Sequence, residues 1–407
     1  MKKLFAWTLV VAMVAMLAVG CASTPAATPN TPTTPNAPAT PNTPAGPAEQ
    51  TLVIAHISPQ TGAAANYGFF MHHASLMATE EINAAGGITG PNGEKIMIEH
   101  HMVDETSNSA QTVESAQKAV SLNPHVILGP NRSGGVIAAE NVWTDAKIPT
   151  ITDPTGTNTN NTEYTFRMQI ASPYWVPLLA KTAIETEGRT RLAMMAGLND
   201  YSEAMAREVE PALKAANMEL VANETFNDGD TDFSAQWLAV KNANPDGVFL
   251  FGYGAEVSII IRQRTELGMK DIRLYGERFT VPAVIEAAGV ENFTNIVTTT
   301  TLSMGDPRPE VQAFFKKYNE RFPEDKGVSP THINHYDSVY IIADIVSRVG
   351  VDSEKIRDEL ANLKDFKGAL ATYSADSAGD LVHHMFTQKC ETAEVWEVMD
   401  FMEFPLT

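Results

Sequence analysis

The sequence has few cysteines and no cluster of basic residues, and each absence excludes classes of protein. Its 407 residues include two cysteines, Cys21 and Cys390. Two are too few for a disulfide scaffold, a structural zinc cluster or an iron–sulfur protein. The formal net charge is −20, and a chain without clustered Lys or Arg is not expected to bind nucleic acid. The hydrophobic fraction of 44% supports ordinary globular cores, in two or three domains of about 150 residues each.

Long hydrophobic runs are also missing, apart from one at the N-terminus. Residues 4–19 are apolar and follow a short basic start. The run is too short to span a bilayer core of about 30 Å, so residues 1–20 are predicted to be a signal peptide. The end of the run resembles a bacterial lipobox, with one extra residue between Leu17 and Cys21. Cys21 is therefore predicted to carry lipid; a plain signal peptide with an incidental cysteine is the alternative.

A linker is predicted over residues 21–50, because residues 24–47 consist almost entirely of Thr, Pro, Asn and Ala. Such a segment cannot bury a core and favours extended polyproline II, with a reach of roughly 70 Å at about 3.1 Å per residue. A lipid with a flexible stalk would hold the folded part outside the cytoplasmic membrane and close to it. An O-glycosylated stalk fits the same interpretation. Cys390 then has no partner in the chain and is expected to be a small buried side chain.

From residue 51 onward the hydrophobic pattern alternates between short strands and helices of about 10–15 residues. This alternation predicts an α/β fold with two doubly wound parallel-sheet lobes, whose ligands bind beyond the carboxyl ends of the strands. The expected strands are 52–57, 95–103, 126–128, 148–152, 192–195, 220–225, 248–251 and 272–275. The expected helices cover about 71–85, 109–120, 202–216, 233–241 and 255–267.

Polar loops follow several of these strands, at 58–68, 129–135, 153–157 and 276–278. Ser133 lies where a helix begins, and a hydroxyl beside free backbone N–H groups suits a carboxylate or a phosphate. Hydroxyls of the 153–157 loop could complete that anion site, and Glu277 could bind a cation. Together these groups would be complementary to a zwitterion. The alternatives are that Ser133 only caps its helix and that Glu277 is a solvated charge.

Two stretches, 52–62 and the string INAAGGITG at 82–90, resemble the opening of the periplasmic branched-chain amino-acid-binding proteins. These proteins are extracytoplasmic components of ABC importers, and the similarity extends over residues 51–407. The resemblance implies a type I periplasmic binding protein, with two α/β lobes joined by three crossover strands that close on the ligand like a Venus flytrap. Lobe 1 would comprise residues 51–171 and 301–375, and lobe 2 residues 172–300 and 376–407.

The same resemblance implies which residues hold an amino-acid carboxylate. Ser133 corresponds to the serine after the third strand, which holds the α-carboxylate. Residues 154–157 correspond to the loop that completes this clamp. Within it Thr157 would give its hydroxyl and amide, Thr155 would give its carbonyl to the amine, and Gly156 lies between them.

The remaining ligand contacts implied by the resemblance involve aromatic residues and one acid. Tyr67 would pack on the ligand side chain, Tyr201 would cover the ligand, and Glu277 would pair with the α-ammonium group. Tyr253 lies in a loop that is shorter than in branched-chain-specific members, so the pocket for the ligand side chain is expected to differ. Two arginines in these loops, Arg132 and Arg278, are expected to face solvent, with binding of a second carboxylate as the alternative.

Catalytic and metal motifs find little support in the sequence. Ser133 is not in a G-x-S-x-G elbow, and neither G-x-x-x-x-G-K-[ST] nor H-E-x-x-H occurs. The adjacent histidine pairs at 72–73, 100–101 and 383–384 point apart, and the His332–His335 spacing lacks other ligands. The alternating aspartates at 228–232 lack the Gly and Glu of an EF-hand, so Asp232 is expected to be a helix N-cap. Neither a metal nor a cofactor is expected.

These observations predict a lipid-anchored solute-binding protein that delivers an amino acid, branched-chain or related, to an ABC importer. Its partners would be the permease and ATPase subunits, its contact with the membrane would be through lipid only, and it would be a monomer without enzymatic activity. One alternative is a ligand sensor of the same fold, and another is a binding protein for a different small carboxylate or an amide. A secreted hydrolase is a third class, which would require turnover of the bound ligand.

Overall fold

The computed structural model describes residues 49–62, 65–106, 108–277, 279, 281–302, 306–325, 333–382, 384–392 and 395–403. Chain contacts separate Met1–Ala45 from Gly46–Thr407, and the described residues belong to the second unit. The predicted signal peptide, Cys21 and nearly all of the linker lie outside the described residues. Every described helix is too short or too polar to cross a bilayer.

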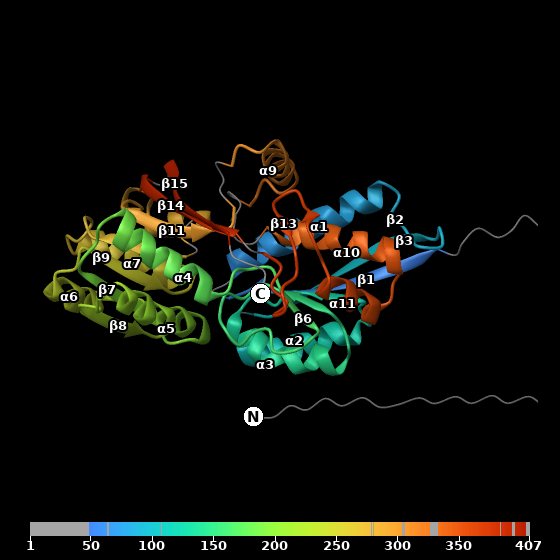
Figure 1. The fold of residues 1–407 in the computed structure, drawn as a ribbon, viewed down its shortest axis with the longest axis horizontal. Coiled ribbons are helices and arrows are strands. Elements are labelled where there is room, and N and C mark those ends of the chain that lie inside the picture. Colours follow the sequence, from blue (N-terminus) through green and yellow to red (C-terminus); the bar gives the residue numbers. More distant parts are fainter. Residues whose placement is uncertain are drawn as a thin grey trace, which may run out of the picture. The chain divides into compact units, whose positions relative to one another are not determined.

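The first half of the chain builds a six-stranded sheet, of which Figure 1 labels β1, β2, β3 and β6. The strand order is β2-β3-β1-β4-β5-β6, and all strands are parallel except β2. Alternate residues of β1 enter different cores: Ile54 packs with residues of α1, and Ala55 and Ile57 pack with residues of α2 and α3. Helix α10 lies against α1. The strands are β1 (Gln50–Ser58), β2 (Ile88–Thr89), β3 (Lys95–Asp104), β4 (Val126–Leu128), β5 (Thr150–Thr152) and β6 (Thr165–Arg167). The helices are α1 (Ala65–Ala84), α2 (Ser109–Ser121), α3 (Ser133–Asp145), α10 (His335–Val349) and α11 (Ser353–Ala361).

A second, seven-stranded sheet has the order β15-β14-β11-β10-β9-β7-β8, in which β14 runs antiparallel to both of its neighbours, β11 and β15. Its strands are β7 (Leu192–Gly197), β8 (Ala222–Phe226), β9 (Gly247–Phe251), β10 (Arg273–Glu277), β11 (Ile296–Thr300), β14 (His384–Thr392) and β15 (Val395–Glu403). Its helices are α4 (Ser172–Lys181), α5 (Asp200–Ala215), α6 (Ser234–Ala243), α7 (Gly254–Glu266) and α8 (Pro282–Ala288). Helix α9 (Pro309–Arg321) packs on α1, and β12 (Phe366–Lys367) pairs with β13 (Thr372–Tyr373).

Both sheets reverse their strand order at one strand, and this determines where a ligand site can form. Strand β1 lies between β3 and β4, and β7 lies between β8 and β9. In open α/β sheets the crevice at such a switch point, beyond the carboxyl ends of the strands, is the usual ligand site. A ligand site is therefore expected at the loops after β1 and β4 in the first sheet and after β7 and β9 in the second.

The chain passes from one sheet to the other after β6, after β11 and after β13. Two of these passages are joined by a buried ion pair, because Arg167 at the end of β6 contacts Asp380 just before β14. Arg167 Nε lies 2.7 Å from Asp380 Oδ1, and Nη2 lies 3.0 Å from Oδ2. The backbones of the two residues also form a parallel bridge.

The predicted α/β class with two largely parallel sheets is confirmed. Cys390 is confirmed as a buried free thiol, and burial raises its pKa to about 12. One detail is wrong: Asp232 is not the N-cap of α6, because the helix begins one residue later and Phe233 holds that position. Asp232 still accepts a hydrogen bond from the Ser234 N–H at 3.0 Å.

Candidate functional site

The loop between β4 and α3 places Ser133 as the first residue of its helix. Gly129 bends the chain at φ +75°, where a Cβ atom would lie 1.8 Å from the carbonyl oxygen of Ile57. The N-cap residue is Arg132, which makes no side-chain capping bond. The alternative interpretation, in which Ser133 only caps its helix, is therefore wrong, because Arg132 holds the N-cap position. A helix N-terminus with no side-chain cap is suited to an anion.

The loop after β5 lies directly against Ser133, as predicted. The Gly156 N–H donates to Ser133 Oγ at 3.2 Å, and a Cβ at Gly156 would lie 2.7 Å from the same atom. Thr155 is fully buried, its carbonyl accepts from the Ser172 N–H at 2.8 Å, and its Oγ1 has no hydrogen-bond partner among the described residues. A buried hydroxyl without a partner is costly unless a ligand or water completes it. Thr157 is half-buried in the same loop.

Buried polar contacts hold this loop in place. Arg167 Nη1 donates to the carbonyl of Gly156 at 2.9 Å, so the guanidinium that binds Asp380 also supports the site. Asp153, at the start of the loop, accepts from Asn334 Nδ2 at 3.3 Å. These contacts hold residues 153–157 against Ser133, and we refer to Ser133 and residues 153–157 together as the first-sheet loops.

The second sheet contributes an acid between two tyrosines. Glu277, the last residue of β10, is 2% exposed and accepts from the Tyr201 hydroxyl at 2.9 Å. Tyr201 lies in the first turn of α5, and its ring stacks on that of Tyr253 with centroids 5.3 Å apart. Tyr253 in turn is the N-cap of α7. The three side chains come from neighbouring strand ends, and a carboxylate held there can bind a cation.

Contacts between the loops of the two sheets bring these groups together. The guanidinium carbon of Arg132 lies 4.9 Å from the ring centroid of Tyr253. Tyr67 lies in the first turn of α1, and its hydroxyl is close to Gly254. A Cβ atom added to Gly254 would lie 2.8 Å from that hydroxyl. The expectation that Arg132 faces solvent is wrong, because the side chain is half-buried against that ring. Arg278 lies outside the described residues.

Two buried carboxyl groups near Arg132 were missed by the sequence analysis. Burial raises the pKa of Glu105 to about 7, although Arg132 and a hydrogen bond from Thr112 oppose the shift. Glu105 Oε2 would lie 3.4 Å from a Cβ on Gly135, so the group lies behind the N-terminus of α3. Burial also raises the pKa of Glu256, which accepts from the Gly229 N–H at 2.8 Å. Glu105 could have been found from its place directly after β3.

A cluster of buried histidines lies under α1 and also was not anticipated. His56 Nδ1 and His100 Nε2 lie 2.8 Å and 3.0 Å from Ser75 Oγ. His335 stacks on His56 with ring centroids 5.0 Å apart, and both of its ring nitrogens lack a hydrogen-bond partner among the described residues. Burial lowers the pKa of His335 and His100 to about 3 and that of His72 to about 4. The histidines are therefore neutral at pH 7.

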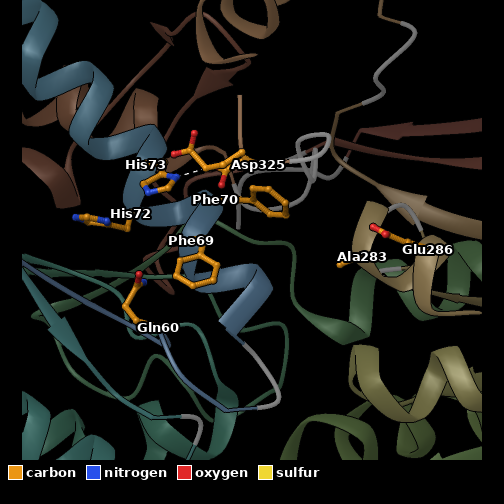
Figure 2. A pocket seen from close by; sticks show the side chains of 9 residues that line it. Gln60, Phe69, Phe70, His72, His73, Ala283, Glu286 and Asp325 are labelled. Carbon is orange, nitrogen blue, oxygen red and sulfur yellow. Dashed lines mark hydrogen bonds and ion pairs between the residues drawn. The ribbon is translucent and has the colours of Figure 1, made fainter. Parts of the chain in front are cut away.

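A cavity of about 520 Å³ lies elsewhere and is lined by none of the predicted ligand residues. Figure 2 shows Phe69, Phe70 and His73 of α1 with Asp325 on one side, and Ala283 and Glu286 of α8 on the other. Its walls therefore come from helices attached to both sheets.

Comparisons with known proteins agree with this architecture. The family model described as "Periplasmic binding protein" matches residues 51–394. A leucine-, isoleucine-, valine-, threonine- and alanine-binding protein of Pseudomonas aeruginosa is 27% identical, over 84% of this chain and 90% of the relative.

Two solved structures are similar to the chain. LivJ of Streptococcus pneumoniae, a branched-chain amino-acid transporter substrate-binding protein in complex with isoleucine, has 25% identity and a TM-score of 0.78, over 86% of this chain and 99% of LivJ. The leucine-binding protein LivK of Thermotoga maritima has the same TM-score at 22% identity, over 86% of this chain and 99% of LivK, and shows the fold alone.

Proposed function

The chain belongs to the periplasmic binding protein family, and from this premise we propose that it captures an amino acid, branched-chain or related, for an ABC importer. The first-sheet loops would bind the α-carboxylate, and Glu277 would bind the α-ammonium group. The two sheets with their helices would act as lobes, 51–171 with 301–375 and 172–300 with 376–407. Permease and ATPase subunits would receive the ligand unmodified, so the protein is proposed to be a monomeric binding protein and not an enzyme.

The observation that carries this proposal is the buried Glu277, bonded to Tyr201 at 2.9 Å. A carboxylate has several acceptor positions, so Tyr201 can orient Glu277 while an ammonium group binds to it. Charge-assisted hydrogen bonds in a buried setting are about twice as strong as neutral ones. The uncapped N-terminus of α3, with Ser133 Oγ and the partnerless Thr155 Oγ1, supplies the complementary anion site.

Aromatic surfaces support the assignment of the remaining contacts. Tyr67 and Tyr253 are 2% and 7% exposed. The Tyr67 hydroxyl lies beside Gly254, the residue that follows Tyr253 in the chain. Their rings offer apolar area to a ligand side chain and hydroxyls to polar atoms. The half-buried Arg132 over Tyr253 is in position to select against ligands that carry a second cation.

The test is calorimetric titration of the purified protein with the proteinogenic amino acids, γ-aminobutyrate and benzoate. We expect binding of α-amino acids, with affinity reduced about 10- to 100-fold by Glu277→Gln, because a hydrogen bond to a charged group contributes about 1.5–3 kcal/mol. Glu256→Gln is the matched control, since it changes another buried carboxylate, on helix α7 beside the second sheet. Unchanged affinity in Glu277→Gln, or binding of benzoate alone, would overturn the assignment of Glu277.

Lipid anchoring at Cys21 is a separate part of the proposal and rests on the sequence. We expect the protein to partition into the detergent phase of a Triton X-114 extraction when expressed in a bacterial host with its own leader. Cys21→Ser is expected to move it to the aqueous phase. Equal partitioning of the two forms would contradict lipidation at this cysteine.

A further inference from the structure

We propose that His73, Glu324 and Asp325 form a binding site for a divalent transition-metal ion on the wall of the 520 Å³ cavity. Each residue offers one ligand atom, and the three atoms lie within 4.8 Å of one another. His73 comes from α1, and the two acids follow α9. The site therefore joins two segments that are distant in sequence, since His73 and Asp325 are 252 positions apart. This site goes beyond the proposed amino-acid site and shares no residue with it.

Contacts with neighbouring side chains and backbone hold two of the three proposed ligands, His73 and Asp325, in place. The His73 ring lies parallel to the Phe322 ring, with centroids 4.1 Å apart and an interplanar angle of 3°. Asp325 Oδ2 accepts from the Tyr318 hydroxyl at 2.7 Å, and the Asp325 N–H donates to the carbonyl of Phe322 at 3.1 Å. The ring plane and one carboxylate are therefore oriented before any ion binds, which lowers the cost of assembling the site.

Helix α9 is itself fixed on α1 by two ion pairs. Lys317 lies 3.0 Å from Glu81, and Arg321 lies 2.8 Å from Glu80. Both cations therefore form their ion pairs with acids of α1. The nearby Glu324 is exposed and can turn toward the cavity.

The chemistry of the three donors suits zinc and its neighbours in the first transition row. One imidazole nitrogen and two carboxylate oxygens bind Zn²⁺ at about 2.0–2.2 Å, which places tetrahedral ligand atoms about 3.4 Å apart. Small rotamer changes would bring atoms within 4.8 Å to that spacing. His73 Nδ1 and Asp325 Oδ2 now lie 2.6 Å apart, so the ion would replace the proton between them and release it. Two carboxylates and a neutral imidazole leave one coordination position open toward the cavity.

Figure 2 shows this pair on the cavity wall that faces Ala283 and Glu286 of α8. The cavity therefore lies between the proposed ligands and a helix attached to the second sheet. His72 and His73, as neighbours along the chain, were not expected from the sequence to bind one ion together. The ligands instead come from elements that are distant in sequence and that periodicity cannot bring together.

The test is titration of tag-free, chelator-stripped protein with ZnCl₂ at pH 7.5, without amino acids present. We expect one Zn²⁺ per chain. His73→Gln and Asp325→Asn should abolish binding, and Glu324→Gln should weaken it at least tenfold. Co²⁺ bound in place of Zn²⁺ should give visible absorption bands that the His73→Gln variant lacks.

His101→Gln is the matched control, because His101 Nε2 also lies close to a carboxylate, 2.7 Å from Glu99 Oε1. It should bind Zn²⁺ as the unmodified protein does. Glu324→Gln changes an exposed side chain and keeps the fold, so its loss of affinity cannot be attributed to unfolding. Zinc binding that survives both His73→Gln and Glu324→Gln, or no binding at micromolar Zn²⁺, would overturn the proposal.

Discussion

The Tyr201 hydroxyl donates a hydrogen bond to Glu277 Oε2 at 2.9 Å, and both side chains are 2% exposed. Tyr201 lies in the first turn of α5 and Glu277 ends β10, so the bond joins a helix and a strand at the carboxyl edge of the second sheet. Tyr201 also stacks on Tyr253. The acid therefore has a defined direction, which is what recognition of an ammonium group requires.

Tyr201→Phe should weaken amino-acid binding about tenfold, since a net hydrogen bond contributes about 1–1.5 kcal/mol. The ring and its stacking on Tyr253 remain, so the fold should be unchanged. Calorimetric titration of Tyr201→Phe, Glu277→Gln and the double variant measures the coupling. If the two losses simply add, Tyr201 does not act through Glu277.

Ser133→Ala should reduce both affinity and stability. The substitution removes the acceptor of the buried Gly156 N–H, and an unsatisfied buried donor costs about 1–3 kcal/mol. Urea unfolding measures the change in stability, and calorimetry measures the change in affinity. Ser133→Thr keeps the hydroxyl and is the control; equal losses in both variants would indicate a packing effect.

Glu105→Gln should change the pH dependence of stability. The folded-state pKa of Glu105 is about 7, above its ordinary value of 4.5. As the pH rises from 4.5 to 7 the unfolded chain loses this proton and the folded chain keeps it, so the unmodified protein loses about 1.4 kcal/mol per pH unit relative to the variant. Above pH 7 the difference should level off. Urea unfolding at pH 5, 6, 7 and 8 checks this, and a difference that is constant with pH would contradict it.

His335→Phe should make the protein more resistant to acid. The folded-state pKa of His335 is about 3, so below pH 6.5 the unfolded chain binds a proton that the folded chain does not. Each such histidine lowers the free energy of unfolding by about 1.4 kcal/mol for every pH unit below 6.5, until the pH reaches its folded-state pKa. The stability advantage of His335→Phe should therefore grow between pH 6.5 and pH 4. Urea unfolding at several pH values in this range checks the prediction, and a stability difference that stays constant with pH would contradict it.

Asp380→Asn should destabilise the protein by about 3–5 kcal/mol, because it leaves a buried guanidinium without its counter-charge. Amino-acid affinity should fall as well, since Arg167 also holds the carbonyl of Gly156. Asp376→Asn, a nearby acid that contacts backbone amides, is the control for loop effects. A variant that loses stability but binds amino acids normally would show that Arg167 does not support the site.

Much of the architecture follows from local patterns. The strand at 126–128 was predicted with its observed bounds, because a continuous apolar run ends at a glycine there. Strand β8 begins two residues later than predicted, at Ala222, since its residues are only partly buried and the hydrophobic signal is weak. The rhythm of strands and helices predicted nothing after residue 276, where the chain crosses between sheets and pairs antiparallel.

Some residues around the candidate site could be predicted from the sequence, and others could not. Those that follow strands, such as Ser133 and Glu277, were predicted because a doubly wound topology places strand ends together. Arg132 was misjudged because its partner, Tyr253, belongs to the other sheet. The histidine cluster and the His73–Asp325 pair depend on side chains meeting across tertiary contacts, and neither spacing nor periodicity encodes such meetings.

The pairing of β11 with β14, which begins with Ile296 opposite Cys390, makes each half of the molecule discontinuous in the gene. No single stretch of coding sequence specifies the second sheet, so expressing residues 172–300 alone would leave β11 as an exposed edge available to other chains. A ribosome must synthesise the chain as far as β14 before that edge can be covered. During synthesis and export the chain therefore needs protection against aggregation until its last two strands have emerged.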